Sequence, residues 1–289
     1  MTTDQAASRL TLVSGKGGVG KSAIATGLAL YSHRQGERVL AIDVLGDGGL
    51  AAHLGGGRLD FKPREVRSGL FAISIDRTRA LAEYLKVQIG VPQFATLGPF
   101  ARAFDALAST APGVREVITL GKVLWETQHG GYDLVVADCP PTGQITGLLR
   151  APVTIAELVP SGRVRQQAEW MGNLLSREET ELVLVTLPEE LPTVETQETM
   201  AVLTAENLVG DPTIVTNRVL PRLESDAKGS GPAAEAAILH RSLYRNQQDW
   251  IKRLPPARKL PYLFGLLTPG EVAARMADAW EQSETRPGK

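Results

Sequence analysis

A glycine-rich segment near the amino end has the composition and spacing of a phosphate-binding loop. Residues 15–22 read Gly-Lys-Gly-Gly-Val-Gly-Lys-Ser and satisfy the pattern G-x-x-x-x-G-K-[ST]. Glycines allow successive backbone N–H groups to turn toward one anion, and the start of a following helix adds the positive end of its dipole. In such a loop Lys21 reaches the β- and γ-phosphates, and the Ser22 hydroxyl coordinates Mg²⁺. The predicted contacts to ATP or ADP are Gly15, Lys16, Gly17, Gly18, Val19, Gly20, Lys21 and Ser22.

A second candidate group follows an apolar run that ends in a carboxylate. Residues 134–138 read Leu-Val-Val-Ala-Asp, and Cys-Pro-Pro-Thr-Gly comes next. Ligands bind at the carboxyl ends of parallel strands, so Asp138 is predicted to hold a water of the magnesium shell and to form the metal site with Ser22. Its alternative role is to cap the helix that follows. The N–H of Gly143 is a candidate contact for the terminal phosphate.

These residues need a scaffold that brings separate loops to one edge. Short apolar runs typical of buried parallel strands occur at residues 9–14, 39–43, 70–75, 134–138, 182–187, 213–217 and 259–262. Helical spacing begins at 22–35, directly after the glycine loop, and recurs between the later runs. The alternation predicts an α/β fold with a doubly wound, mostly parallel sheet flanked by helices. The glycine-rich stretch 46–58 is expected to be flexible.

A helical insertion is predicted within this fold. Strand patterns stop between residues 78 and 128, where apolar residues at three- and four-residue spacing indicate three helices, and a further helical stretch covers about 159–176. We expect residues 1–289 to form a single P-loop domain that carries these segments as a helical subdomain. Residues 224–232 are predicted to be a mobile loop before a helix at 232–251. The apolar side chains of the insertion form either a groove wall or the core of the three helices: Phe94, Leu97, Phe100, Phe104 and Leu107.

Composition narrows the class of protein. The 289 residues include 31 Lys and Arg against 32 Asp and Glu, so the net charge of -1 gives no general attraction to nucleic acid or anionic lipid. The single cysteine, Cys139, cannot form an internal disulfide and fits a reducing compartment. No signal-peptide pattern and no apolar run of membrane-spanning length is visible, so we expect a cytoplasmic protein without an integral membrane segment or a nucleic-acid partner.

Several segments together resemble one family of ATPases. Lysine at the second loop position, in SGKGGVGKS, resembles the deviant Walker A loop of the MinD, ParA, NifH and ArsA class, in which this lysine crosses a dimer interface to the partner's nucleotide. DCPPTGQITGLL resembles switch II of ArsA and of the ATPases that target tail-anchored proteins. TLPEELPTVET resembles a strand and helix of that family and is not explained by phosphate chemistry. The chain is most similar to the ArsA-like ATPases of actinobacteria, some of which pair with a second, non-identical chain.

The resemblance implies further site residues and one departure. Asn217 occupies the family position that recognises adenine, and Pro261 would pack against the base. A local turn is the alternative for Asn217. The family places a water-orienting aspartate in switch I where this chain has Leu45, which cannot orient water. Asp47, two residues further on, substitutes for it if the loop folds back, and is otherwise a turn residue.

The resemblance implies a dimeric, Mg²⁺-dependent ATPase that couples its nucleotide state to a partner or client. Lys16, Lys21, Asp47 and Asp138 are the predicted catalytic residues. The partner is a second copy or a second ArsA-like chain, and a hydrophobic client protein is possible if the insertion forms a groove. The main alternative is a hydrolysis-poor regulatory subunit that completes a heterodimer with an active paralogue. A MinD/ParA-type positioning ATPase is disfavoured because the carboxyl end lacks a basic amphipathic membrane face.

Overall fold

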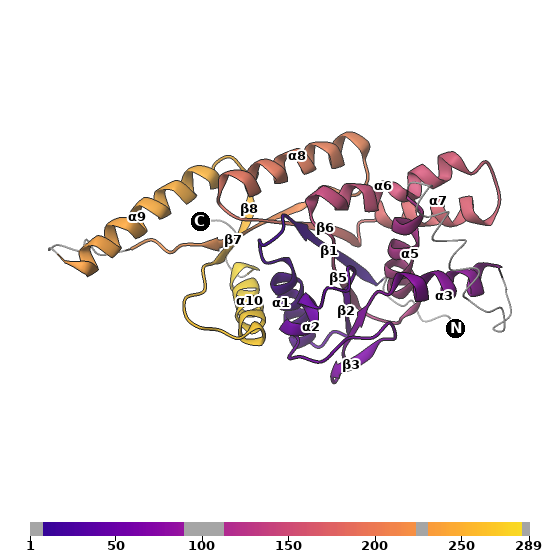
Figure 1. Cartoon of the computed structure of the whole chain (residues 1–289), viewed down its shortest axis with the longest axis horizontal. Coiled ribbons are helices and arrows are strands. Elements are labelled where there is room, and N and C mark those ends of the chain that lie inside the picture. Colours follow the sequence, from indigo (N-terminus) through magenta and orange to yellow (C-terminus); the bar gives the residue numbers. More distant parts are fainter. Residues whose placement is uncertain (1–7, 90–112, 224–230, 285–289) are drawn as a thin grey trace.

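The computed structural model describes residues 8–89, 113–223 and 231–284, and centres on one eight-stranded sheet (Figure 1). The strand order is β3-β4-β2-β5-β1-β6-β7-β8. The strands are β1 (Arg9–Gly15), β2 (Val39–Asp43), β3 (Arg64–Arg67), β4 (Leu70–Ser74), β5 (Leu134–Asp138), β6 (Thr180–Thr186), β7 (Thr213–Val219) and β8 (Ala257–Pro261). All neighbouring pairs are parallel except β3 with β4, which is antiparallel. The predicted α/β fold with a mostly parallel sheet is confirmed.

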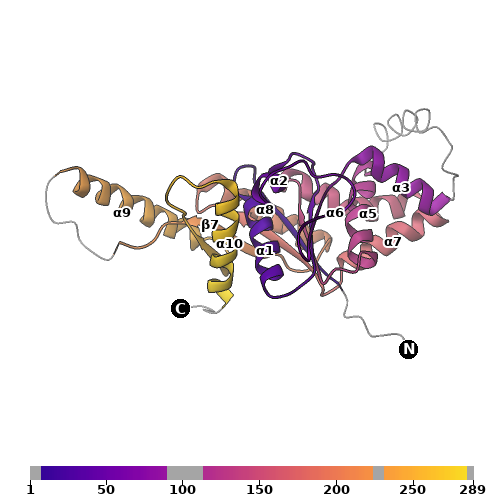
Figure 2. The same ribbon diagram turned by 90° about the horizontal axis from the view of Figure 1, so that it is seen from below.

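Helices cover both faces of the sheet. They are α1 (Lys21–Arg34), α2 (Gly49–His53), α3 (Arg77–Ile89), α5 (Val114–His129), α6 (Thr142–Leu158), α7 (Arg163–Leu175), α8 (Glu190–Glu206), α9 (Pro232–Ile251) and α10 (Pro269–Glu284). One layer consists of α1, α2 and α10, and the other of α5, α6, α7 and α8 (Figures 1 and 2). The central strands β1, β2, β5 and β6 have continuous apolar sequences because helices cover them on two sides.

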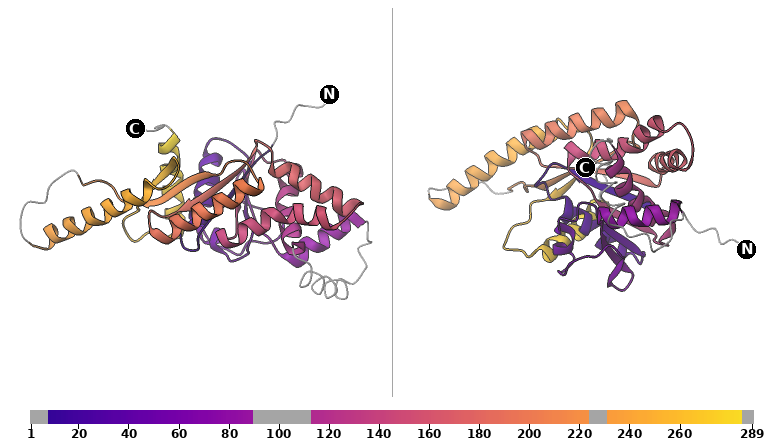
Figure 3. Two further views of the ribbon diagram at one scale, coloured as in Figure 1. Left: turned by 90° about the horizontal axis from the view of Figure 1, so that it is seen from above. Right: turned by 45° about the vertical axis from the view of Figure 1, so that its right-hand side comes forward.

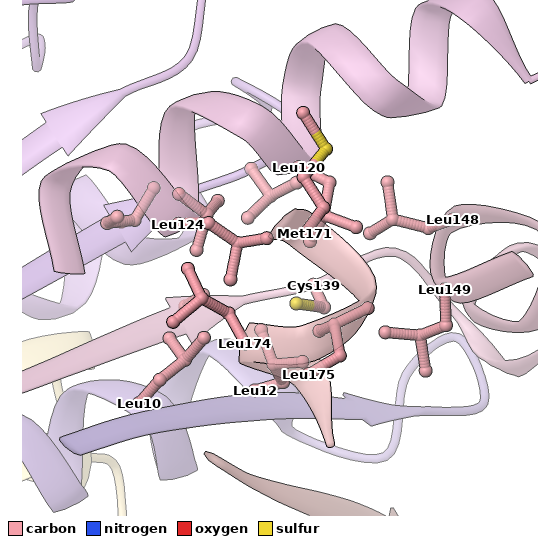
Figure 4. Packing of buried hydrophobic residues seen from close by; sticks show 14 of the residues in the cluster. Leu10, Leu12, Leu120, Leu124, Cys139, Leu148, Leu149, Met171, Leu174 and Leu175 are labelled. Atoms are coloured by element: carbon pink, nitrogen blue, oxygen red, sulfur yellow. The ribbon is translucent and has the colours of Figure 1, made fainter. Parts of the chain in front are cut away.

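The two faces of the sheet have separate cores. In β1, Val13 packs with residues of α1 and α10, whereas Leu10 and Leu12 belong to the cluster on the opposite face. This division follows from the alternation of side chains along a strand. Figure 4 shows the second core, where Leu120 of α5 and Met171 of α7 pack with Leu10 and Leu12. The helices α5 and α7 therefore share their core with the sheet.

The molecule is elongated, and its two ends are built differently. At one end α3 packs on α5, and α7 packs on α5 and α6. At the other end α9 extends away from the sheet, as Figure 3 also shows, and none of its side chains is buried. The predicted helix at 232–251 coincides with α9. Of the three helices expected between 78 and 128, α3 and α5 lie within the described residues, whereas Phe94, Leu97, Phe100, Phe104, Leu107 and the loop at 224–230 lie outside them.

Two elements differ from the expectations. The stretch 46–58 was expected to be flexible, but it contains the short helix α2, which contacts α1 and α10. Leu50 is fully buried in that helix, so the segment has an apolar anchor between its glycines. The strand β3 was not predicted, because its sequence Arg-Glu-Val-Arg has no apolar run and lies at the sheet edge.

Candidate nucleotide-binding site

The glycine loop joins the carboxyl end of β1 to the start of α1, and its backbone requires glycine at three positions. Gly15, Gly18 and Gly20 have φ values of 148°, 86° and 96°. A Cβ atom at Gly15 would lie 2.1 Å from the Val185 carbonyl oxygen, and one at Gly20 would lie 2.7 Å from Nδ2 of Asn217. Conformations of this kind are accessible to glycine and strained for other residues. The loop is thus held between β6 and β7.

Three side chains with complementary chemistry meet beside this loop. The partly buried Lys21 ammonium lies 3.4 Å from the Lys16 carbonyl oxygen, and the charge of Asp138 acts on it. The Ser22 hydroxyl donates a hydrogen bond to the Asp138 carboxylate, which is only 6% exposed. The side chains predicted to bind phosphate and Mg²⁺ therefore lie together.

Burial sets the protonation behaviour of these groups. It lowers the pKa of Lys21 and raises the pKa of Asp138 to about 6, against hydrogen bonding from Ser22, which lowers the latter. The negative charge of Asp43 raises the pKa of Asp138 further. A buried carboxylate without a compensating cation is unfavourable, and a bound divalent ion would favour its charged form.

The donor set fits Mg²⁺ held jointly by protein and phosphate. Within the described residues, no group of three or more His, Cys, Asp or Glu side chains could hold a metal ion alone. Mg²⁺ commonly takes one or two protein oxygens and completes its shell with waters and substrate phosphates. Ser22 and Asp138 offer an oxygen pair of that kind next to the loop.

The loop after β2 folds back onto the site. The buried Asp43 carboxylate accepts the N–H groups of Gly46 at 2.7 Å and Gly48 at 3.1 Å, and Asp47 accepts the N–H of Gly49 at 3.0 Å. A Cβ atom at Gly49 would lie 2.7 Å from Ser22 Oγ. Sequence reasoning missed the role of Asp43 in holding this loop.

Asp47 and Leu45 occupy different surroundings in that loop. The charge of Asp47 acts on both Lys21 and Asp138, so this carboxylate lies near the phosphate-binding side chains. Leu45 is 36% exposed and lines a hollow of about 240 Å³ together with Pro140 and Gln144. That Asp47 acts in place of the residue at position 45 stays a prediction.

The segment after β5 is hydrogen-bonded to β1 and leads into the long helix α6. Ser14 donates a hydrogen bond to the Pro140 carbonyl oxygen at 2.6 Å. Gly143 lies exposed in the first turn of α6, and a Cβ atom there would meet no other atom within 4 Å. The N–H of Gly143 thus lies in the first turn of α6, and its contact with phosphate stays a prediction, while packing does not demand glycine at this position. Cys139 is buried, and burial raises the pKa of its thiol, so it is an unreactive core residue.

Asn217 and Pro261 lie on adjacent strands at the same edge of the sheet. Asn217 lies in β7 at the irregularity between Thr216 and Val219 and is 3% exposed, and Pro261 ends β8, opposite Val219. The Asn217 amide donates to the Val19 carbonyl oxygen at 2.8 Å and accepts the N–H of Arg218 at 2.8 Å. The side chain therefore joins the glycine loop to the irregular end of β7, where Arg218 has a φ of 56°. Each polar atom of the amide has capacity for one further hydrogen bond.

Lys16 has a partner that sequence reasoning did not identify. Its ammonium forms an ion pair with Glu195 of α8, and the other oxygen of that carboxylate accepts the Thr142 hydroxyl at 3.1 Å. Glu195 lies in TLPEELPTVET, the segment that phosphate chemistry left unexplained. The family-specific sequence of this segment was the one sign that it contains a residue of the site.

Comparisons with known proteins agree with this geometry. The family model for anion-transporting ATPases of the ArsA type matches residues 8–176. ATPase BagA of Mycobacterium tuberculosis is 35% identical over 231 residues, which cover 74% of this chain and 66% of BagA. ATPase get3 of Pyrenophora tritici-repentis is 27% identical over 177 residues, which cover 60% of this chain and 51% of get3. The chain spans just under two thirds of the mycobacterial relative and about half of the fungal one.

Within the described residues, no helix is long and apolar enough to cross a membrane. The family model covers the glycine loop, the Asp43 loop and the start of α6, which are the segments that meet at the candidate site. The chain belongs to the ArsA family of anion-transporting ATPases, and its similarity extends to mycobacterial and GET3 ATPases.

Proposed function

We propose that the chain binds MgATP at the glycine loop and hydrolyses it. The observation that carries the proposal is the meeting of Lys21, Ser22 and Asp138 beside a loop whose backbone needs glycine. Loop N–H groups and Lys21 bind the phosphates, and the dipole of α1 adds to the attraction. Ser22 and Asp138 would hold Mg²⁺, which neutralises phosphate charge when bound.

The remaining site residues receive roles in the same proposal. Asp47 orients the attacking water, since its charge already acts on the phosphate-binding side chains. The N–H of Gly143 approaches the terminal phosphate from the start of α6. Asn217 and Pro261 contact the adenine base, using the hydrogen-bonding capacity that the Asn217 amide retains.

The functional unit is proposed to be a dimer in the cytoplasm. Lys16 is the loop residue that a single P-loop does not require, and in a dimer it would pair with phosphate across the interface. The partner is a second copy or a second ArsA-like chain, and nucleotide state would be coupled to it or to a hydrophobic client. We propose one ATPase domain over residues 1–289, with a helical subdomain at about 78–128 and 159–176.

A hydrolysis-poor regulatory subunit is the second candidate. Leu45 favours it, because an alkyl side chain stands where the resembling family places a water-orienting carboxylate. In that case the chain binds nucleotide and an active paralogue performs the hydrolysis.

Single-turnover phosphate release and light scattering, measured on the same sample with MgATP, separate these possibilities. We expect phosphate release and an ATP-dependent rise in mass for the chain alone. Binding without release, with a rise in mass only when a second ArsA-like chain is added, would support the regulatory subunit. No binding of MgATP would refute both proposals.

A further inference from the structure

Glu195 connects two segments that the proposed function treats separately. One carboxylate oxygen pairs with the Lys16 ammonium of the glycine loop, and the other accepts the hydroxyl of Thr142, the first residue of α6. The three residues are distant in sequence, and both contacts leave Glu195 only partly buried, with 36% of its side chain exposed. A single acidic side chain therefore touches the phosphate loop and the segment after Asp138 at once.

The helix α8 presents Glu195 at a defined position. Its buried side consists of Pro192, Thr193, Thr196, Thr199 and Leu203, and Thr193 and Thr196 are at most 1% exposed. The Thr193 hydroxyl donates to the Leu187 carbonyl oxygen at 3.3 Å, and the Thr196 hydroxyl donates to the Pro192 carbonyl oxygen at 2.7 Å. The buried side packs against β6 and α6, which sets the rotation of α8 on the fold. The segment TLPEELPTVET thus places one carboxylate against the glycine loop.

A carboxylate in this place competes with phosphate. The Lys16 ammonium is 30% exposed and carries the only positive charge that Glu195 contacts within the described residues. A polyphosphate bound in the loop would attract the same ammonium and repel the carboxylate. Phosphate binding by Lys16, on its own or on a partner chain, would therefore weaken this ion pair.

We propose that Glu195 is a positioning residue that holds Lys16 in the nucleotide-free chain, so that ATP and Glu195 compete for one ammonium. The bond to Thr142 ties the start of α6 to the same carboxylate, and release of Lys16 therefore changes the contacts of both segments. This inference rests on the proposed function, which places ATP at the glycine loop. The contacts of Glu195 with Lys16 and Thr142 are the observations that support the competition.

A double-mutant cycle measured by calorimetry with MgATPγS tests the proposal. Glu195→Gln keeps the size of the side chain and its ability to accept from Thr142, but removes the charge that holds Lys16. Partly exposed ion pairs are weak, so we expect the affinity to rise by about two- to five-fold. In a Lys16→Ala background the same change should give little or no gain. Glu198→Gln, at an exposed position one turn further along α8, is the matched control and should leave affinity unchanged.

Three outcomes would overturn the assignment. A weaker affinity in Glu195→Gln would mean that the carboxylate assists nucleotide binding. An unchanged affinity would mean that the Lys16–Glu195 ion pair has no influence on nucleotide binding. An equal gain with and without Lys16 would mean that the negative charge of Glu195 repels the nucleotide directly and does not act through Lys16. Thermal melting of each variant verifies that the fold is retained. If the wild-type chain fails to bind MgATPγS, the proposed function is refuted as well. If it binds but the cycle shows no coupling between Lys16 and Glu195, only the role of Glu195 is refuted.

Discussion

Replacing Asp138 by asparagine should stabilise the nucleotide-free protein while removing a carboxylate that we propose holds magnesium. Burial raises the pKa of this carboxyl from 3.8 to about 6, so between these pH values the folded chain binds more protons than the unfolded chain. The contribution of Asp138 to the free energy of unfolding therefore falls as the pH rises through this window, and it is least favourable above pH 6. At 1.36 kcal/mol per pH unit, the ionised carboxyl destabilises the fold by about 3 kcal/mol at pH 7.5 and by about 1 kcal/mol at pH 4.5.

The assay is urea unfolding of wild type and Asp138→Asn at both pH values, with metal and nucleotide removed. The asparagine carbonyl still accepts the Ser22 hydroxyl, so the variant should gain up to about 3 kcal/mol at pH 7.5 and clearly less at pH 4.5. Asp211→Asn, at an exposed position, is the control and should show no gain at either pH. Destabilisation of Asp138→Asn at pH 7.5, or a gain that does not depend on pH, would refute the burial argument.

Three further predictions concern the glycine loop, the hydrophobic core and ATP hydrolysis. Gly15→Ala places a methyl group 2.1 Å from the Val185 carbonyl oxygen and should destabilise the protein by at least about 2 kcal/mol in thermal or urea unfolding; a neutral result would show that the loop has another conformation. Leu120→Ala opens a cavity in the core of α5 and should lower the free energy of unfolding by about 2–5 kcal/mol, and a loss under 1 kcal/mol would mean that this core is loosely packed. Asp47→Asn should slow single-turnover hydrolysis by about 10²-fold with little change in ATP affinity, whereas a gain in Leu45→Asp with no loss in Asp47→Asn would show that Asp47 is silent.

The strands were predictable where the apolar pattern was continuous. The predicted runs at 39–43 and 134–138 coincide with β2 and β5, because every residue in them is buried between two helical layers. The run at 259–262 forms β8, which begins two residues earlier. The edge strand β3 and the helix α2 were not predictable, since one has polar, exposed residues and the other lies among glycines.

The residues of the candidate site were likewise predictable in part. The glycine loop occupies one contiguous segment, and Asp138 ends a parallel strand, so both follow from local pattern and from the common edge of the sheet. The contacts of Lys16 with Glu195 and of Asn217 with Val19 join residues separated by 179 and 198 positions. Such pairs depend on how α8 and β7 pack, which spacing along the chain does not specify.

Calorimetric titration of MgATP into the wild-type chain and into Lys21→Ala tests whether the glycine loop is the nucleotide site. Lys252→Ala is the control, because that lysine lies exposed at the end of α9. We expect one nucleotide site in wild type and in the control, and no measurable binding in Lys21→Ala. Equal affinity in all three proteins would contradict the assignment of the nucleotide site to the glycine loop.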